Sequence, residues 1–266
     1  MEIQSIKLIY FSPTGTTKNI VHEIARKSAV NTIELVDITS PKTREKPLRI
    51  KEDELIIVGV PVYMGRVPTL ASDWLSTISV CNAPAICVVV YGNRVYDNAL
   101  LELRDLLTNR GAKSIAGAAF IGEHSFSSTK LPTAEGRPDI NDLKLAEKLG
   151  RAAKEKLLRT ASLEQVSEAN IPGQYPYEGI TKLWDVDFIA VSEACTQCGT
   201  CAEKCPTGAT ESGKSFSINN VKCITCCACI KNCPNGAKSI KSGEVMDAAI
   251  RLNSLYRDRK EPELFL

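Results

Sequence analysis

Two groups of cysteines are the residues of this sequence whose types and spacing most clearly define a chemistry. Residues 195–206 read CTQCGTCAEKCP and residues 223–234 read CITCCACIKNCP, so the pattern C-x2-C-x2-C-x3-C-P occurs twice. Three thiolates in one short loop can bind three irons of an iron-sulfur cube, and a more distant cysteine completes the set. Zinc sites more commonly use separated pairs of ligands. The repeat therefore predicts iron-sulfur clusters, which move single electrons, and leaves zinc as the weaker alternative.

The repeated cysteine pattern resembles that of the bacterial two-cluster ferredoxins over about residues 185–241. Gly208-Ala209 and Gly236-Ala237 keep the same offset as the cysteines, so the duplication continues past the ligands. In that family the fourth cysteine of each motif ligates the cluster of the other motif. The resemblance thus implies two [4Fe-4S] clusters with crossed ligation. One set of ligands is Cys195, Cys198, Cys201 and Cys233, and the other is Cys223, Cys226, Cys229 and Cys205.

Three further cysteines lie outside the repeated pattern. Cys227 stands between two ligands, where the first motif has Gly199, and Cys81 and Cys87 flank a strand-like segment. Free cysteine commonly packs as a small buried hydrophobic residue. We therefore expect these three cysteines to be core residues rather than ligands.

The first 160 residues alternate strand-like and helix-like segments. Apolar segments typical of buried strands are IKLIYF, NTIELVDI, DELIIVGV, AICVVVYG and SIAGAAFIG, at residues 6–11, 31–38, 53–60, 85–92 and 114–122. Segments typical of helices lie at about residues 15–29, 69–79, 97–109 and 139–159. This alternation predicts an α/β fold with a doubly wound, five-stranded parallel sheet covered on both faces. Ligands of such sheets bind in the loops that follow the strands.

The loop after the first strand has the features of a phosphate site. Residues 8–21, LIYFSPTGTTKNIV, run from a strand through a hydroxyl-rich turn into a helix. Backbone N–H groups and the helix dipole attract a phosphate there, although such hydroxyls also serve as ordinary helix caps. The stretch is neither G-x-G-x-x-G nor G-x4-G-K-[ST], which disfavours a dinucleotide or a nucleoside triphosphate. The candidate residues are Ser12, Thr14, Gly15, Thr16 and Thr17.

This loop resembles the flavodoxin signature, a strand followed by S-x-T-G-x-T, with Val21 where the family usually has alanine. The resemblance covers roughly residues 3–160 and implies a flavodoxin-like domain whose loop binds the phosphate of FMN. Two later loops resemble the clamps that hold the isoalloxazine ring in this family. Their residues are Pro61, Val62, Tyr63, Met64 and Gly65 in one loop, and Tyr91, Gly92 and Asn93 in the other.

The sequence leaves the neighbours of the flavin ring open. Tyr63 or Met64 on one side, with Tyr91 or Tyr96 on the other, are candidates for the ring faces. Gly65 is the residue whose peptide can turn most easily, so that its carbonyl accepts a hydrogen bond from the protonated N5 of the reduced flavin.

Two arginines and two histidines of the flavodoxin-like segment are further candidates for an effect on a bound flavin. Arg66 and Arg94 flank the clamp loops, where a guanidinium would favour the anionic reduced flavin, although both residues also suit solvated loops. His22 and His124 are able to relay protons near neutral pH, but we expect both to be packed or solvated residues.

Composition and charge indicate which kinds of partner and which cellular compartment fit the sequence. Of 266 residues, 44% are hydrophobic and 24% charged, and 33 basic against 31 acidic residues give a formal charge of +2. This balance suggests neither nucleic acid nor an anionic membrane as a partner. The chain shows no export signal and no apolar stretch long enough for a bilayer. With eleven cysteines arranged for metal binding, we expect a cytoplasmic protein in a reducing compartment.

Breaks in periodicity suggest the domain organisation. We expect an FMN-binding domain at residues 1–161, a linker at 162–184 rich in breakers such as Pro172 and Gly173, and a small α+β ferredoxin domain at 185–241. Residues 242–266 are expected to form a C-terminal helix and tail. The apolar stripe of that helix, Val245 to Tyr256, is predicted to dock on the flavodoxin-like half, with a cap at Ser242.

Two functions fit a flavodoxin-ferredoxin fusion flavoprotein. The favoured one is electron transfer, in which FMN exchanges electrons with the clusters and with redox proteins; a fused module keeps that donor or acceptor at a high effective concentration. The alternative is an FMN-dependent reductase of a small electron acceptor such as a quinone, a nitro compound or a corrinoid. The sequence carries no recognisable acid, base or substrate motif, so whether the protein is itself an enzyme is left open.

Overall fold

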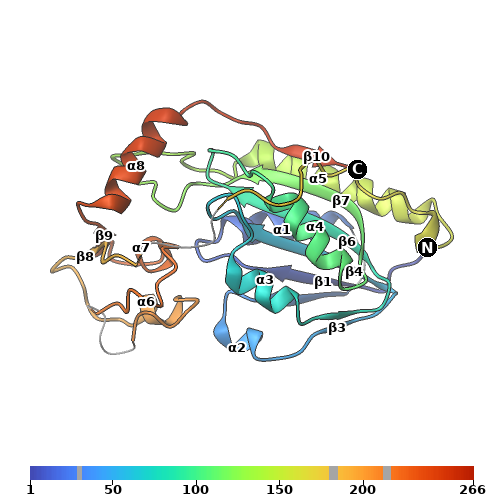
Figure 1. The fold of residues 1–266 in the computed structure, drawn as a ribbon, viewed down its shortest axis with the longest axis horizontal. Helices are drawn as coiled ribbons and strands as arrows, with labels where there is room; N and C mark the ends of the chain where they lie inside the picture. The colour runs from blue at the N-terminus through green and yellow to red at the C-terminus, as the bar shows by residue number, and fades with distance from the viewer. Residues whose placement is uncertain (29–31, 180–184, 212–216) are drawn as a thin grey trace.

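A six-stranded sheet lies at the centre of the computed structural model, which describes residues 1–28, 32–179, 185–211 and 217–266 (Figure 1). The strand order is β10-β7-β6-β4-β1-β2. The strands are β1 (Ser5–Tyr10), β2 (Thr32–Asp37), β4 (Glu54–Pro61), β6 (Pro84–Tyr91), β7 (Lys113–Ile121) and β10 (Glu263–Phe265). The first five are parallel, whereas β10 is antiparallel to β7. The predicted doubly wound parallel sheet is confirmed, with one additional strand.

Helices cover both faces of this sheet because alternate residues along a strand point to opposite sides. The helices are α1 (Thr16–Ser28), α3 (Thr69–Leu75), α4 (Ala99–Thr108) and α5 (Ile140–Leu158). Ile6 and Leu8 of β1 belong to the core beneath α1 and α5, whereas Ile9 belongs to the core beneath α3 and α4. Since the parallel strands all end on the same side, the loops that follow them meet there.

The C-terminal residues return to the sheet after α8 (Glu244–Leu255). We call residues 256–266 the C-terminal strap; it is drawn in red in Figure 1 and ends in β10 beside β7. Leu264 packs against the core under α1 and α5, and Phe265 packs against the core under α3 and α4. The strap therefore joins both cores of the sheet domain, and it turns the predicted five-stranded sheet into one of six strands.

The cysteine region forms a small α+β module, drawn in orange in Figure 1. Its elements are β8 (Ile189–Val191), α6 (Thr200–Glu203), α7 (Ala228–Lys231) and β9 (Lys238–Ile240). β8 and β9 pair antiparallel, and an isolated bridge joins Thr210 to Ile218. A separate core contains Phe188, Cys227 and Val245 of α8. Helix α8 thus packs on this module through Val245 as well as reaching the sheet domain.

Part of the segment predicted to be a linker, residues 162–184, packs on the sheet domain. It contains the 3-10 helix η1 (Leu163–Gln165), and Leu163, Val166 and Ile171 are buried in the two cores. The N–H of Ala169 donates to the carbonyl of Ser114 over 2.9 Å. Residues 180–184 of the predicted linker lie outside the described residues.

Short elements complete the part of the chain that the structure describes. They are α2 (Pro41–Arg44) and a two-stranded pair, β3 (Arg49–Ile50) with β5 (Ser79–Val80). Cys87 and Cys227 are buried as expected, but Cys81 is exposed, so its predicted core position was wrong. Cys81 directly follows the two-residue strand β5, at the border of the domain. Within the described ranges, no helix combines the length and the apolar character needed to cross a membrane.

Candidate functional site

A cavity of about 400 Å³ opens where the parallel strands end. Loops after β1, β4, β6 and β7 line it, as expected for a doubly wound sheet. The predicted residues that line it are Ser12, Thr14, Thr16, Thr17, Pro61, Val62, Tyr63, Met64, Gly65, Tyr91 and Gly92. Two other predicted residues, Gly15 and Asn93, are not among its lining residues.

The hydroxyl-rich loop forms one end of the cavity. Ser12 Oγ accepts a hydrogen bond of 3.0 Å from the N–H of Lys18, and the carbonyl of Gly15 accepts one of 3.1 Å from the N–H of Asn19. Gly15 has a φ of +89°, which suits glycine, so it shapes the turn without lining the cavity. The first N–H groups of α1 have no partner inside the helix. This end of the cavity therefore suits a phosphate.

The loop after β4 turns sharply beside the cavity. Tyr63 and Arg66 exchange backbone hydrogen bonds of 3.0 and 3.1 Å across Met64 and Gly65, whose φ angles are +53° and +84°. Positive φ at both central residues is the pattern of a type I′ turn. A Cβ atom at residue 65 would lie 2.3 Å from Asp97 Oδ2. The positive φ therefore favours glycine at this position, and a side chain there would also displace the Asp97 carboxylate.

The aromatic residues that line the cavity differ in part from those the sequence suggested. Tyr63, Met64 and Tyr91 line it, whereas Tyr96 does not. The Tyr96 ring lies 5.5 Å from the Tyr91 ring, and its hydroxyl donates to Glu263 Oε2 over 3.0 Å. Tyr96 thus supports Tyr91 from behind and anchors the C-terminal strap. Of the candidates named from the sequence for stacking on a flavin ring, Tyr63, Met64 and Tyr91 line the cavity, and Phe126 lines it as well.

Asn93 binds the C-terminal strap instead of facing the cavity. Its Nδ2 donates to the carbonyls of Tyr256 and Asp258 over 2.8 and 2.9 Å, and only 2% of the residue is exposed. Lys260 of the strap also donates to the carbonyl of Arg94. The strap therefore holds the loop after β6 in place from outside.

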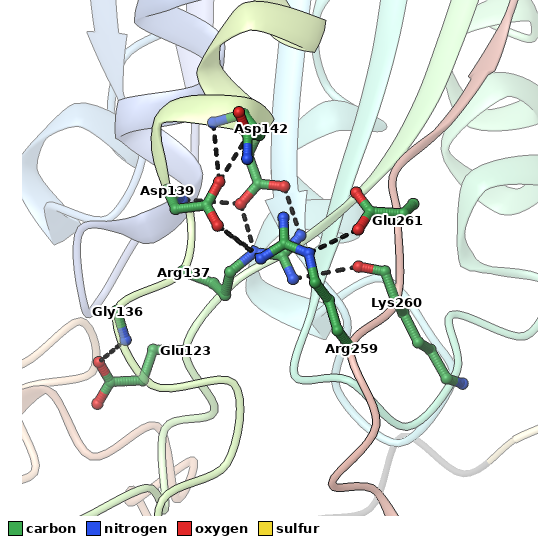
Figure 2. Close-up of polar contacts among 9 residues, drawn as sticks. Glu123, Gly136, Arg137, Asp139, Asp142, Arg259, Lys260 and Glu261 are labelled. Atoms are coloured by element: carbon green, nitrogen blue, oxygen red, sulfur yellow. Dashed lines mark hydrogen bonds and ion pairs between the residues drawn. The ribbon is translucent and has the colours of Figure 1, made fainter.

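A second group of contacts fixes the strap to the loop before α5 (Figure 2). The guanidinium of Arg137, itself paired with the buried Asp142, donates to the carbonyl of Lys260 over 3.1 Å. Arg259 donates to Asp139 Oδ2 over 2.6 Å, and this hydrogen bond lowers the pKa of Asp139 to about 2. Asp139 also caps α5, so the strap and the start of that helix share one polar network.

Sequence reasoning missed the residues that line the cavity from outside the sheet domain. Ile224 and Thr225 come from the second cysteine loop, and Ala248, Arg251 and Leu252 come from α8. No local pattern marks these residues, because their position depends on how the module packs on the sheet domain. Within the sheet domain, Glu123 and Phe126 also line the cavity. Both follow β7, so the rule that ligands bind in the loops after parallel strands could have identified them.

The two histidines differ in position. His22 packs against Tyr10, with 5.7 Å between ring centroids, and does not line the cavity, in agreement with the expectation of a packed residue. His124 does line it. Its Nδ1 accepts a 3.0 Å hydrogen bond from the N–H of Phe126. Burial lowers the pKa of His124 to about 4, and the positive charge of Lys231 lowers it further. His124 is therefore neutral at pH 7, and its remaining proton is on Nε2.

The eight motif cysteines fall into two groups around two small cavities. Cys195, Cys198, Cys201 and Cys233 line one of them. Cys205, Cys223, Cys226 and Cys229 line the other. In both, the fourth cysteine comes from the other motif, which is the grouping that crossed ligation requires. Among the described residues, no three His, Cys, Asp or Glu side chains converge in a way that would hold a single metal ion.

Polar contacts join the cysteine module to the sheet domain beside the large cavity. Lys231 Nζ donates to Glu123 Oε1 over 2.6 Å and to the carbonyl of Ser127 over 2.8 Å. Asn232 Nδ2 donates to the carbonyl of Pro13 over 3.1 Å. Because Glu123 and Pro13 line the large cavity, the second cysteine motif is attached directly to its wall.

Comparison with known families matches both halves of the chain. A family model described as a flavodoxin domain matches residues 7–96, and one described as a 4Fe-4S dicluster domain matches residues 188–234. The chain is a flavodoxin domain fused to a 4Fe-4S dicluster domain. The pairing of these domains makes it an electron-transfer flavoprotein. No curated protein matches the chain.

Solved structures that resemble part of this chain include two flavodoxins. A flavodoxin from the domain Archaea is 13% identical, with a TM-score of 0.41, and the match covers 58% of this chain and 99% of that one. Oxidised flavodoxin 2 from Bacillus cereus is 17% identical, with a TM-score of 0.40 and coverage of 57% and 99%. Rubredoxin oxygen:oxidoreductase from Desulfovibrio gigas is 15% identical, with a TM-score of 0.39 and coverage of 59% and 37%.

The two arginines of the flavodoxin domain that were candidates for the flavin ring have different surroundings. Arg94 lines the cavity and pairs with Asp97. Arg66 does not line the cavity. Its guanidinium makes two hydrogen bonds of 2.8 and 2.9 Å to Glu102 and lies 5.3 Å from the ring centroid of Tyr177. Arg66 is therefore held by Glu102 and Tyr177 and, unlike Arg94, does not line the cavity.

Proposed function

We propose that the protein binds FMN in the large cavity and passes electrons between this flavin and two [4Fe-4S] clusters. The observation that carries the proposal is the position of Ile224 and Thr225. These residues lie between Cys223 and Cys226, and they also line the cavity. The loop that would bind one cluster is thus a wall of the site that would hold the flavin, so nothing larger than this loop separates the two cofactors.

The same positions support an order for the cofactors. The cluster of Cys205, Cys223, Cys226 and Cys229 would be next to the flavin. The cluster of Cys195, Cys198, Cys201 and Cys233 would be farther out, where Cys198 is exposed to solvent. We propose that single electrons enter or leave the protein at this outer cluster, through redox proteins, and that FMN takes up or releases them singly or in pairs.

The residues present fit FMN at both ends of the cavity. The hydroxyl-rich loop offers N–H groups to a terminal phosphate. Tyr63, Met64 and Tyr91 offer faces for the ring at the other loops. When bound, FMN supplies the exchange between one-electron and two-electron chemistry. Helix α8 and the second cysteine loop would shield the flavin ring from solvent. Neutral His124 would present an Nε2–H group that can donate a hydrogen bond.

The direct test is cofactor analysis of anaerobically purified protein. We expect about eight iron atoms, about eight sulfides and one FMN per chain, because eight cysteines match the crossed pattern. Stoichiometric zinc without sulfide would contradict the clusters, and a flavin released as FAD would contradict the phosphate site. Stopped-flow reduction of the clusters should then be followed by reduction of the flavin in the same molecule. Rapid turnover with a quinone, nitro compound or corrinoid, but not with a ferredoxin, would favour the reductase instead.

The two arginines provide a matched prediction about the flavin potential. Arg94→Ala is expected to lower a one-electron potential of bound FMN by roughly 40 mV, which corresponds to about 1 kcal/mol, because a guanidinium beside the cavity favours the anionic reduced flavin. Arg66→Ala should leave the potential unchanged. It should lower the free energy of unfolding by about 2 kcal/mol, since the buried Glu102 loses its charged partner.

Anaerobic redox titration and urea unfolding of both variants measure these two effects. The two variants remove the same charge from neighbouring loops, so each serves as the control for the other. Equal shifts of potential in both variants, or a shift in Arg66→Ala alone, would contradict the assignment of Arg94 to the flavin.

A further inference from the structure

Lys238 is a buried cation among the cluster-binding cysteines. It is the first residue of β9, next to Val191 of β8. Only 4% of the residue is exposed, and its Nζ has no hydrogen-bond partner in the part of the chain that the structure describes. An ammonium group carries three donors and a full charge, and burying it without a partner is costly. A buried and unpaired lysine therefore indicates that an anionic group is bound beside it.

The cavity next to Lys238 identifies that group. Lys238 lines the small cavity formed by Cys195, Cys198, Cys201 and Cys233. Lys238 thus lies beside the outer set of ligands. Four thiolates around an iron-sulfur cube outnumber the positive charge of its core, so the ligated cluster is an anion.

The two halves of the module differ at this position. The repeat offset that relates Cys205 to Cys233 relates Thr210 to Lys238. Thr210 lines the inner cavity, as Lys238 lines the outer one, and Thr210 is equally buried. A threonine adds a hydroxyl but no charge. The pseudo-twofold module is therefore symmetric in its ligands and asymmetric in the charge next to them.

We propose that Lys238 raises the reduction potential of the outer cluster relative to that of the cluster beside the flavin. Reduction adds one electron to an anionic cluster, so a fixed cation at short range stabilises the reduced form more than the oxidised form. Net charge and hydrogen bonds to sulfur are known determinants of cluster potentials. The resulting difference favours the movement of electrons from the flavin side toward the exposed side of the module.

This inference rests on the proposed function, because it requires both clusters. The test is anaerobic redox titration, followed by electron paramagnetic resonance, of the full chain and of Lys238→Met, Lys238→Arg and Lys241→Met. Lys241 is the matched control, since it lies three residues away, is partly exposed and pairs with Asp187. Iron and sulfide analysis of the parent protein first establishes whether the clusters are present, and failure at that step would count against the proposed function alone.

Lys238→Met is expected to reduce the equilibrium constant for one-electron reduction of the outer cluster at least tenfold. This corresponds to a reduction potential lower by about 59 mV. Lys238→Arg and Lys241→Met should stay close to the parent. A parental potential in Lys238→Met would overturn the proposal. If Lys238→Met does not retain its clusters, Lys238→Gln replaces it. Loss of the outer cluster in both neutral variants with retention in Lys238→Arg would also support a required charge, whereas loss in Lys238→Arg as well would show that the residue only packs.

Discussion

Replacing Cys205 with alanine is expected to remove the cluster beside the flavin cavity and to leave the outer cluster in place. Cys205 lies four residues after Cys201 in the sequence, but it lines the cavity formed by Cys223, Cys226 and Cys229. The N–H of Ala209 donates to Cys205 Sγ over 3.2 Å, which holds the thiolate in that position. The variant should therefore contain about half of the parental iron and sulfide.

The functional effect of Cys205→Ala should be larger than its effect on iron content. The remaining cluster is the outer one, so electrons that enter there lose the intermediate next to the flavin. We expect flavin reduction through the clusters to slow sharply in stopped-flow experiments, while FMN stays bound. A small chemical reductant that reaches the flavin directly should still reduce it at the parental rate.

Cys233→Ala is the matched control, because the module places the same contact at its other site. The N–H of Ala237 donates to Cys233 Sγ over 3.3 Å, and Cys233 lines the cavity of the first motif. This variant should lose the outer cluster and keep the inner one. If Cys205→Ala instead damaged the cluster of Cys195, Cys198 and Cys201, ligation would follow the sequence and the crossed arrangement would be wrong.

The features that the sequence predicted best depend on local geometry. Three of the four ligands of each cluster lie a few residues apart, and strands such as β4 after Glu54 and the whole of β6 are apolar because helices cover both faces. Loops that follow parallel strands meet at one end of the sheet for topological reasons. The five parallel strands and most of the cavity could therefore be read from spacing and periodicity, whereas the crossed grouping of the cysteines came from the resemblance to two-cluster ferredoxins.

The features that the sequence did not predict depend on contacts between distant segments. β10 has three residues, Glu263–Phe265, which is too short for an alternating pattern to stand out. Arg66 and Arg94 occupy similar loops, and only the position of Glu102 distinguishes them. Lys238 occupies a strand position in an unremarkable sequence, and its burial next to the cysteines arises from the pairing of β8 with β9.

Removing the C-terminal strap is expected to weaken FMN binding without removing the clusters. A chain that ends at Leu255 keeps α8 but lacks both carbonyls that accept hydrogen bonds from Asn93. Leaving a buried donor unpaired costs about 1–3 kcal/mol. Because Asn93 lies between cavity residues Gly92 and Arg94, part of this cost should appear as a loosened binding loop. We expect the Kd for FMN to rise about tenfold, which is about 1.4 kcal/mol.

Fluorescence titration of the flavin-free protein with FMN measures this effect. Asn93→Ala in the full chain should reproduce part of it, and Glu261→Ala, a strap variant at an exposed side chain paired only with Arg259 among the described residues, should not. A longer deletion after Ser242 also removes Ala248, Arg251 and Leu252 from the cavity wall. That variant should bind FMN more weakly still, and it should transfer electrons between clusters and flavin more slowly, because it lacks the helix that packs on the module through Val245 and lines the cavity. Parental FMN affinity in the chain ending at Leu255 would show that the strap serves the stability of the sheet alone.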